Sequence, residues 1–200
     1  IMNQFIWKYK ELNQKEISHI SQEFSVPNSI ATIMFLKSIT DKKKSRSFFY
    51  NNFDSMHDPF LMLDMDKAVQ RLSQARDKKE LILIIGDYDA DGTTAASLLF
   101  LYFQSINLDV EYYIPNRQTE GYGISRKAIE YAHKIGTKLI ITCDCGITAI
   151  EEIEYAKDYK IDTIITDHHK QKDILPKAHA ILNPNRKDCT YPFKGLCGAG

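Results

Sequence analysis

The 200-residue sequence lacks an apolar run long enough to cross a bilayer, and it shows no charged-then-apolar signal segment. It also lacks net charge, because 26 Lys and Arg residues balance 26 Asp and Glu residues. No global basic field therefore indicates nucleic acid, and any such binding must come from local patches. Internal repeats and low-complexity segments are missing as well. We expect an ordinary globular protein that is cytoplasmic and does not bind membranes.

Cysteine is scarce, and the four residues are Cys143, Cys145, Cys189 and Cys197. Structural zinc sites usually pair their cysteines as C-x2-C, whereas this chain has C-x-C followed much later by C-x7-C. A zinc site is therefore the weaker interpretation. We expect reduced thiols that pack as small, buried side chains.

Helical patterns fill the first eighty residues. Leu61, Met65, Val69 and Leu72 recur at the spacing of one helical face. The basic run "DKKKSRSFF" at 41–49 is interpreted as a solvated connection between helices, in preference to a DNA contact.

From residue 81 onward, strand patterns alternate with helical patterns. Strands are predicted over 81–87, 110–116, 138–144 and 162–167, and helices over 93–106, 125–135 and 148–159; a short apolar stretch follows over 178–184. Such alternation predicts an α/β fold with a mostly parallel sheet flanked by helices, because right-handed crossovers place a helix between successive parallel strands. We predict a helical N-terminal region over 1–78 and a sheet domain over 79–200.

The stretch "GDYDADGTT" at 86–94 begins like a calcium-binding EF-hand loop. An EF-hand needs a bidentate Glu at position twelve, and counting from Asp87 this position holds Leu98. The run before the stretch also has the pattern of a buried strand and not of a helix. The aspartates are therefore interpreted as a carboxylate cluster at the carboxyl end of a strand.

Polar residues follow every predicted strand and the apolar stretch after them. They are Asp87, Asp89 and Asp91 after the first strand, Asn116 and Arg117 after the second, Asp144 after the third, Asp167, His168 and His169 after the fourth, and Asn183 at the end of the last apolar stretch. The carboxyl ends of parallel strands share one edge of the sheet, so topology brings these residues together. Carboxylates with imidazoles suit Mn²⁺, Mg²⁺, Fe²⁺ or Zn²⁺, and this many ligands predicts two divalent ions.

The loop "NRQTEGYG" at 116–123 has features of a substrate-binding loop. Gly121 and Gly123 let the backbone approach a phosphate, Arg117 can pair with one, and Tyr122 offers a face for base stacking. A flexible loop held by Asn and Gly turn chemistry explains the same residues equally well.

The motifs "DYDADG", "CDCG" and "TDHH" resemble the DHH phosphoesterase superfamily, whose members hydrolyse phosphodiesters or pyrophosphate with two divalent ions. Within it, "HDPFLMLDMDKAVQRL", "YIPNRQTEGYGIS", "LNPNR" and "YPFKGLCGAG" are similar to the RecJ family of bacterial single-strand-specific DNA exonucleases, from about Trp7 to Gly200. The pyrophosphatase branch carries a metal-binding His two residues before Asp87, where this chain has Ile85. This difference disfavours a pyrophosphatase.

The resemblance implies roles for the clustered residues. Asp89 would bind one ion with help from Asp87, Asp91 and His168 would bind the other, and Asp144 would bridge the two. Asp144 and His169 are the implied catalytic residues, and His169 would either meet the substrate phosphate or support the metal ligands from the second shell. Asp167 is expected in the outer shell, since ligating imidazoles commonly donate their second N–H to a carboxylate. The resemblance also favours Asn116, Arg117, Gly121, Tyr122 and Gly123 as substrate-binding residues.

The implied activity is a 5′-to-3′ exonuclease that releases nucleotides from single-stranded DNA with Mn²⁺ or Mg²⁺, in company with repair and recombination proteins. Two alternatives stay open: a phosphodiesterase for short oligonucleotides or cyclic dinucleotides, and an inactive nucleic-acid-binding module. The resemblance further implies an Asp ligand downstream of the histidine pair, where this chain has Asp173 and Asp188, neither of which follows a buried strand. We therefore expect a fragment whose sheet domain is incomplete at its C-terminus and whose second metal site lacks a ligand.

Overall fold

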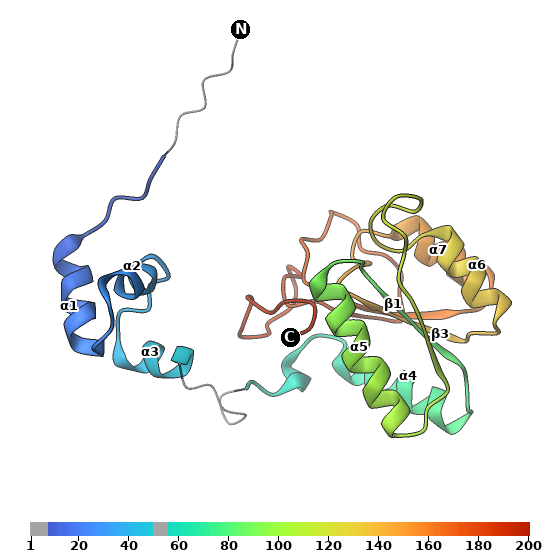
Figure 1. The fold of residues 1–200 in the computed structure, drawn as a ribbon. Helices are drawn as coiled ribbons and strands as arrows, with labels where there is room; N and C mark the ends of the chain where they lie inside the picture. Colours follow the sequence, from blue (N-terminus) through green and yellow to red (C-terminus); the bar gives the residue numbers. More distant parts are fainter. Residues whose placement is uncertain (1–7, 50–55) are drawn as a thin grey trace, which may run out of the picture. The chain divides into compact units, whose positions relative to one another are not determined.

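The computed structural model describes residues 8–49 and 56–200, which belong to two compact units, Ile1–Met56 and His57–Gly200. The first unit contains α1 (Gln14–Phe24), α2 (Asn28–Leu36) and α3 (Lys42–Phe49) (Figure 1). Asn13 caps α1, because its side chain accepts a hydrogen bond from the backbone N–H of Glu16. The unit buries a small apolar cluster made of Ile17, Ile20, Ala31, Met34 and Ile39.

Helix α3 corrects one sequence prediction. Residues 42–49 were expected to form a solvated connection, and they form two turns of helix instead. Lys and Arg are good helix formers, and the run contains neither Gly nor Pro to interrupt it. Lys42 and Arg46 are exposed, so the basic run is helical and still faces solvent.

The second unit is built on a five-stranded parallel sheet with the order β2-β1-β3-β4-β5. The strands are β1 (Ile82–Gly86), β2 (Val110–Tyr113), β3 (Leu139–Cys143), β4 (Asp162–Thr166) and β5 (Ala180–Leu182). Every neighbouring pair is parallel. The predicted α/β fold with a parallel sheet is confirmed.

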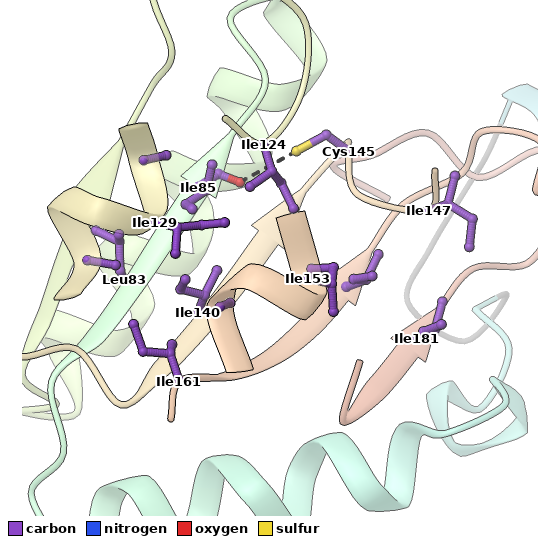
Figure 2. Packing of buried hydrophobic residues seen from close by; sticks show 14 residues of the cluster. Leu83, Ile85, Ile124, Ile129, Ile140, Cys145, Ile147, Ile153, Ile161 and Ile181 are labelled. Carbon is purple, nitrogen blue, oxygen red and sulfur yellow. Dashed lines mark hydrogen bonds between the residues drawn. The ribbon is translucent and has the colours of Figure 1, made fainter. Parts of the chain in front are cut away.

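Helices cover both faces of this sheet. They are α4 (Met65–Asp77), α5 (Ala90–Ser105), α6 (Arg126–Lys134) and α7 (Ile150–Asp158) (Figure 1), and the short 3-10 helix η2 (Pro59–Leu61) precedes α4. Side chains alternate between the faces along β1: Ile82 and Ile84 pack with residues of α4 and α5, and Leu83 and Ile85 pack with residues of α6 and α7. Figure 2 shows the second of these clusters, in which the Cys145 thiol lies 3.9 Å from the Ile85 carbonyl oxygen.

The buried face of α4 differs from the predicted one. Leu61 and Val69 are exposed, and the fully buried residues of the helix are Ala68, Arg71 and Ala75. Arg71 tolerates burial because its guanidinium lies 2.8 Å from Glu80 and 2.6 Å from Asp162. An apolar repeat could not reveal this face, since an ion pair occupies its centre.

Helix α4 also changes the division of the chain. We expected the helical region to extend to residue 78, but α4 buries Ala68 and Ala75 in the same cluster as β1 and β3. The second unit accordingly begins at His57. Among residues 8–49 and 56–200, no helix is long and apolar enough to cross a membrane.

Three of the four cysteines are buried and form no disulfide, as the packing interpretation predicts. Cys143 and Cys145 belong to the clusters on opposite faces of the sheet, and Cys189 packs with Met62 and Tyr191. Cys197 differs, because it is exposed.

The strand order creates a switch point between β1 and β3. The chain leaves β1 toward β2 through α5, and it then returns to the other side of β1 to form β3. Ligand sites of open parallel sheets lie at the carboxyl ends of the strands at such a point. Gly86 pairs with Cys143 in register, so the residues that follow, Asp87 and Asp144, leave the sheet side by side.

We expect Ile140→Ala to lower the free energy of unfolding by about 2–5 kcal/mol, because Ile140 is buried in the central strand β3 and its truncation leaves a cavity. Urea unfolding of both proteins would measure the difference. Leu101→Ala is the matched control: Leu101 is 63% exposed on α5, and its truncation should change stability by less than about 0.5 kcal/mol. Equal losses in the two variants would contradict the assigned core.

Candidate active site

Three aspartates lie between the end of β1 and the first turn of α5: Asp87 and Asp89 in the connecting loop, and Asp91 within the helix. Asp89 caps α5, and its Oδ1 accepts hydrogen bonds from the backbone N–H groups of Asp91 (2.9 Å) and Gly92 (3.0 Å). A Cβ at Gly92 would lie 2.6 Å from the backbone N and O of Asp87, so the loop can fold this tightly only with glycine there. The turn holds Asp87 almost fully buried while Asp89 stays exposed.

Asp87 and Asp144 are the buried carboxylates of the site. Oδ1 of each is buried and accepts no well-directed hydrogen bond. Burial raises the pKa of the Asp87 carboxyl, and the charge of Asp89 adds to the rise. A buried carboxylate oxygen without a donor is costly, so these two atoms are candidates for a cation.

Asp144 has a strained backbone, with a φ of 62° in the left-handed region. Its Oδ1 lies 3.0 Å from Nε2 of His168. Burial and the charges of Asp91 and Asp89 together raise the pKa of Asp144 to about 6, and the two histidines oppose the rise. The turn after β3 therefore directs a carboxylate toward other acidic groups at the cost of strain and repulsion.

Asp167 organises the loop after β4. Its Oδ1 accepts hydrogen bonds from the backbone N–H groups of His168 (2.7 Å) and His169 (3.0 Å), and its Oδ2 accepts one from Ile147 (2.9 Å). Oδ1 also lies 2.7 Å from Nδ1 of His169. Burial lowers the pKa of His169, but the hydrogen bond to Asp167 and the nearby carboxylates raise it overall. Both carboxylate oxygens of Asp167 are engaged inside the protein.

Two groups of potential ligand atoms form at this edge. Asp87, Asp89 and Asp144 make one, Asp144, His168 and His169 make the other, and within each group the atoms lie within 4.8 Å of one another. Asp144 belongs to both. The sequence predicted that His169 meets the substrate phosphate or supports the ligands from outside; here a ring nitrogen of His169 lies among the potential ligand atoms, and its role stays a prediction.

Asp91 is placed differently from the other aspartates. Its Oδ2 lies 3.6 Å from Nε2 of His168, yet its carboxylate also accepts hydrogen bonds from the backbone N–H groups of Gly198 (2.7 Å) and Ala199 (2.8 Å). Burial raises the pKa of Asp91, and these hydrogen bonds lower it overall. Asp91 thus fastens the segment around Gly198 beside the site. As a metal ligand it stays a prediction.

The loop at 116–123 reaches the site through the side chains of Arg117 and Tyr122. The Arg117 guanidinium carbon lies 5.2 Å from the centre of the Tyr88 ring, so Arg117 lies beside the first acidic loop. Asn116 acts as a turn former, since its Oδ1 accepts from the N–H groups of Gln118 (2.9 Å) and Thr119 (3.3 Å). The two glycines, Gly121 and Gly123, have φ values of 80° and 82° that favour glycine.

Tyr122 directs its hydroxyl into the site. The hydroxyl oxygen lies 3.2 Å from the carbonyl oxygen of Asp144 and 3.1 Å from Nδ1 of His169, and the two rings meet edge to face at 5.7 Å. Burial and the charge of Asp167 raise the pKa of Tyr122. The sequence suggested only base stacking for Tyr122, because nothing in the loop shows which way its hydroxyl points.

Sequence reasoning missed several residues that hold these loops. Glu120 accepts hydrogen bonds from the hydroxyl groups of Tyr113 (2.7 Å) and Ser125 (2.8 Å) and fixes the loop at both ends. Asn185 donates to the His168 carbonyl. The only sequence signal for Glu120 and Asn185 was that both lie inside the quoted motifs. A single sequence does not reveal which residues form hydrogen bonds with each other.

Residues 81–200 match the model of the DHH family, N-terminal domain. The chain belongs to the DHH family. Three strands of the DHH domain deliver the acidic and histidine residues described above, after β1, β3 and β4.

Relatives with this domain are named single-stranded-DNA-specific exonuclease RecJ. The chain is 36% identical to the protein of Bacillus subtilis over 194 residues, which cover 97% of the chain and 25% of the relative. It is 42% identical to the protein of Escherichia coli over 137 residues, which cover 68% and 24%. The chain thus spans about a quarter of the length of these curated relatives.

Two solved structures are similar to this DHH-family chain. A crystal structure of exonuclease RecJ bound to manganese superposes with a TM-score of 0.66 at 28% identity, covering 72% of this chain and 37% of that one. RecJ from Thermus thermophilus in complex with Mn²⁺ gives a TM-score of 0.65 at 21% identity, with 94% and 26% covered. At 21% identity the second likeness speaks for the fold alone.

We predict that Gly198→Ala weakens Mn²⁺ binding by about 10–100-fold, the range for disturbing groups that orient metal ligands. A Cβ at Gly198 would lie 2.6 Å from Cβ and 2.8 Å from Cγ of Asp144, so it must move the Asp144 carboxylate. Isothermal titration calorimetry with Mn²⁺ measures the change. Gly195→Ala is the control, because its Cβ would meet the ring of the exposed Phe193, which can rotate away. Equal affinities in the two variants would contradict the assignment.

Proposed function

We propose that this chain is the DHH domain and N-terminal region of a nuclease that hydrolyses phosphodiester bonds of single-stranded DNA, releasing nucleotides in the 5′-to-3′ direction with two divalent ions, Mn²⁺ or Mg²⁺. The observation that carries the proposal is the pair of ligand groups sharing Asp144. The proposal that the substrate is single-stranded DNA is supported by the relatives, whose name is single-stranded-DNA-specific exonuclease RecJ. Cytoplasmic location and contacts with repair and recombination proteins stay predictions.

The residues present fit two hard cations. Asp87 offers a buried carboxylate oxygen without a hydrogen-bond partner, Asp144 offers one that lies 3.0 Å from Nε2 of His168, and the imidazoles of His168 and His169 add nitrogen ligands to one group. Carboxylates with few imidazoles suit Mn²⁺ and Mg²⁺. Asp87, Asp89 and Asp144 would hold one ion, and Asp144 with the histidines would hold the other. Such a pair lowers the pKa of a shared water and neutralises charge on the phosphate.

The protein groups around the ligands prepare them for a phosphodiester. Asp167 accepts from Nδ1–H of His169 in the tautomer that this contact favours, so Nε2 faces away from Asp167. Tyr122 links His169 to the backbone of Asp144 and limits rotation of the ring. Arg117 lies beside Tyr88 in the first acidic loop, where its guanidinium can pair with a phosphate of the strand.

The two alternative functions, a phosphodiesterase for short substrates and an inactive binding module, predict other results in an assay of DNA cleavage. A phosphodiesterase for short substrates would cleave di- to pentanucleotides or cyclic dinucleotides and lose activity on long DNA. An inactive binding module would hold DNA without cleaving it. The intact Asp and His ligand groups argue against the inactive module, because binding DNA needs no buried, unpaired carboxylates.

Chelation with excess EDTA is predicted to abolish nucleotide release, and added Mn²⁺ or Mg²⁺ to restore it, because the acidic groups would otherwise repel the phosphate. The assay follows nucleotides released from labelled single-stranded DNA, with duplex DNA and pentanucleotides as parallel substrates. Cleavage that persists in EDTA would rule out the two-metal proposal. Preference for pentanucleotides over long strands would favour the short-substrate enzyme.

Replacing the shared carboxylate should cost more than replacing any other ligand. We expect Asp144→Asn to lower turnover by at least about 100-fold and to weaken both Mn²⁺ sites, because it removes one charged ligand from each group. Asp173→Asn is the control, since Asp173 is exposed and its Oδ1 lies 3.6 Å from Lys187. Near-normal turnover and two intact sites in Asp144→Asn would refute the bridging role.

A further inference from the structure

The segment that follows β5 is joined to the histidine loop by two side-chain amides. Nδ2 of Asn183 donates to the carbonyl oxygen of His169 at 2.9 Å, and Nδ2 of Asn185 donates to the carbonyl oxygen of His168. The two donors are two residues apart, and the two acceptors are adjacent. The segment therefore clamps two consecutive peptide carbonyls.

This clamp is itself rigid. Asn183 is completely buried, and its Oδ1 accepts a hydrogen bond from the backbone N–H of Asn185 at 2.7 Å. Next in the chain, Arg186 donates to the Ile181 carbonyl at 2.9 Å and to Oδ2 of Asp64 at 2.7 Å. The amides are thus tied to the end of β5 and to the start of α4, both of which are fixed by the sheet core.

The histidine backbone is held from both sides. Asp167 accepts from the N–H groups of His168 and His169, and the asparagines donate to their carbonyls. These contacts fix the backbone conformation of His168 and His169, and with it the directions in which both imidazoles leave the backbone. One imidazole then lies 3.0 Å from the Asp144 carboxylate, and the other lies 3.9 Å from it.

We propose that Asn183 and Asn185 are positioning residues, which set the direction of the two imidazoles by fixing the backbone carbonyls of His168 and His169. The proposal rests on the proposed two-metal function, because it supplies the reason why both imidazoles must point at Asp144. It assigns no contact with substrate to either asparagine. Their part is to keep the ligand geometry within the few tenths of an ångström that a metal site requires.

An Asn-to-Asp replacement isolates the clamp. Aspartate has nearly the same shape as asparagine, but it lacks the N–H donor and presents an oxygen to the carbonyl. Its added negative charge near the site would by itself strengthen cation binding. Weaker binding in these variants must therefore come from misplaced ligands and not from charge. Asn107→Asp is the matched control, because Asn107 is exposed in the turn after α5.

The experiment titrates Mn²⁺ into Asn183→Asp, Asn185→Asp, Asn107→Asp and the unchanged chain by calorimetry, at a temperature where circular dichroism shows each to be folded. We expect each clamp variant to bind Mn²⁺ about 10–100-fold more weakly at the histidine-containing site, with the control unchanged. The KM for DNA should stay unchanged while kcat falls. High Mn²⁺ should restore part of kcat at a temperature where circular dichroism shows every variant to be folded already, so that refolding cannot explain the gain.

Asn185 is partly exposed, so Asn185→Asp keeps the proposal testable if the fully buried Asn183 does not tolerate replacement. Clamp variants that bind Mn²⁺ as tightly as the unchanged chain overturn the positioning role and leave the proposed function standing. An unchanged chain that binds Mn²⁺ but never cleaves DNA contradicts the proposed function alone, and the variants' affinities still decide the positioning role. An unchanged chain that binds no Mn²⁺ overturns both.

Discussion

The concentration of carboxylates around Asp144 is the constraint to which the rest of the site responds. Buried, in a left-handed backbone and near Asp89 and Asp91, this residue carries the costs of desolvation, strain and repulsion together, and its pKa rises to about 6. Apolar packing does not explain why such a carboxylate is kept inside the protein. A cation bound by Asp144 and its neighbours would explain it, because the positive charge offsets both the desolvation of the carboxylate and the repulsion between the aspartates.

Backbone groups hold most of this charge in place. The N–H groups at the start of α5 fix Asp89, those of the 198–199 segment fix Asp91, and those of the histidine loop fix Asp167. Each of these carboxylates is thus oriented by peptides whose own positions come from the sheet. The arrangement is prepared before any ligand arrives, which limits the entropy lost on binding.

Sequence patterns predicted the sheet and its edge more fully than the site. Short apolar runs such as Ile82–Gly86, which alternate with helical patterns along the chain, predict parallel strands. The carboxyl ends of parallel strands share one edge of the sheet, so the sequence could place Asp87, Asp144 and His168 near one another. The hydroxyl direction of Tyr122, the capture of Asp91 by Gly198 and Ala199, and the donors of Asn183 and Asn185 depend on loop conformation. Loop conformation comes from long-range contacts, which leave no periodic signal. Helix α3 and the inner face of α4 were misjudged for a related reason, because charge was taken as evidence against helix and against burial.

The buried carboxylate oxygens also connect ligand binding with stability. Oδ1 of Asp87 is buried without a hydrogen-bond partner, and Oδ1 of Asp144 is buried near other carboxylates with Nε2 of His168 3.0 Å away, so the folded state without cations carries a cost that the unfolded chain does not. A cation that binds only the folded arrangement removes this cost and adds its own binding free energy to stability. Folding of the site and assembly of the metal centre are, on this account, parts of one equilibrium.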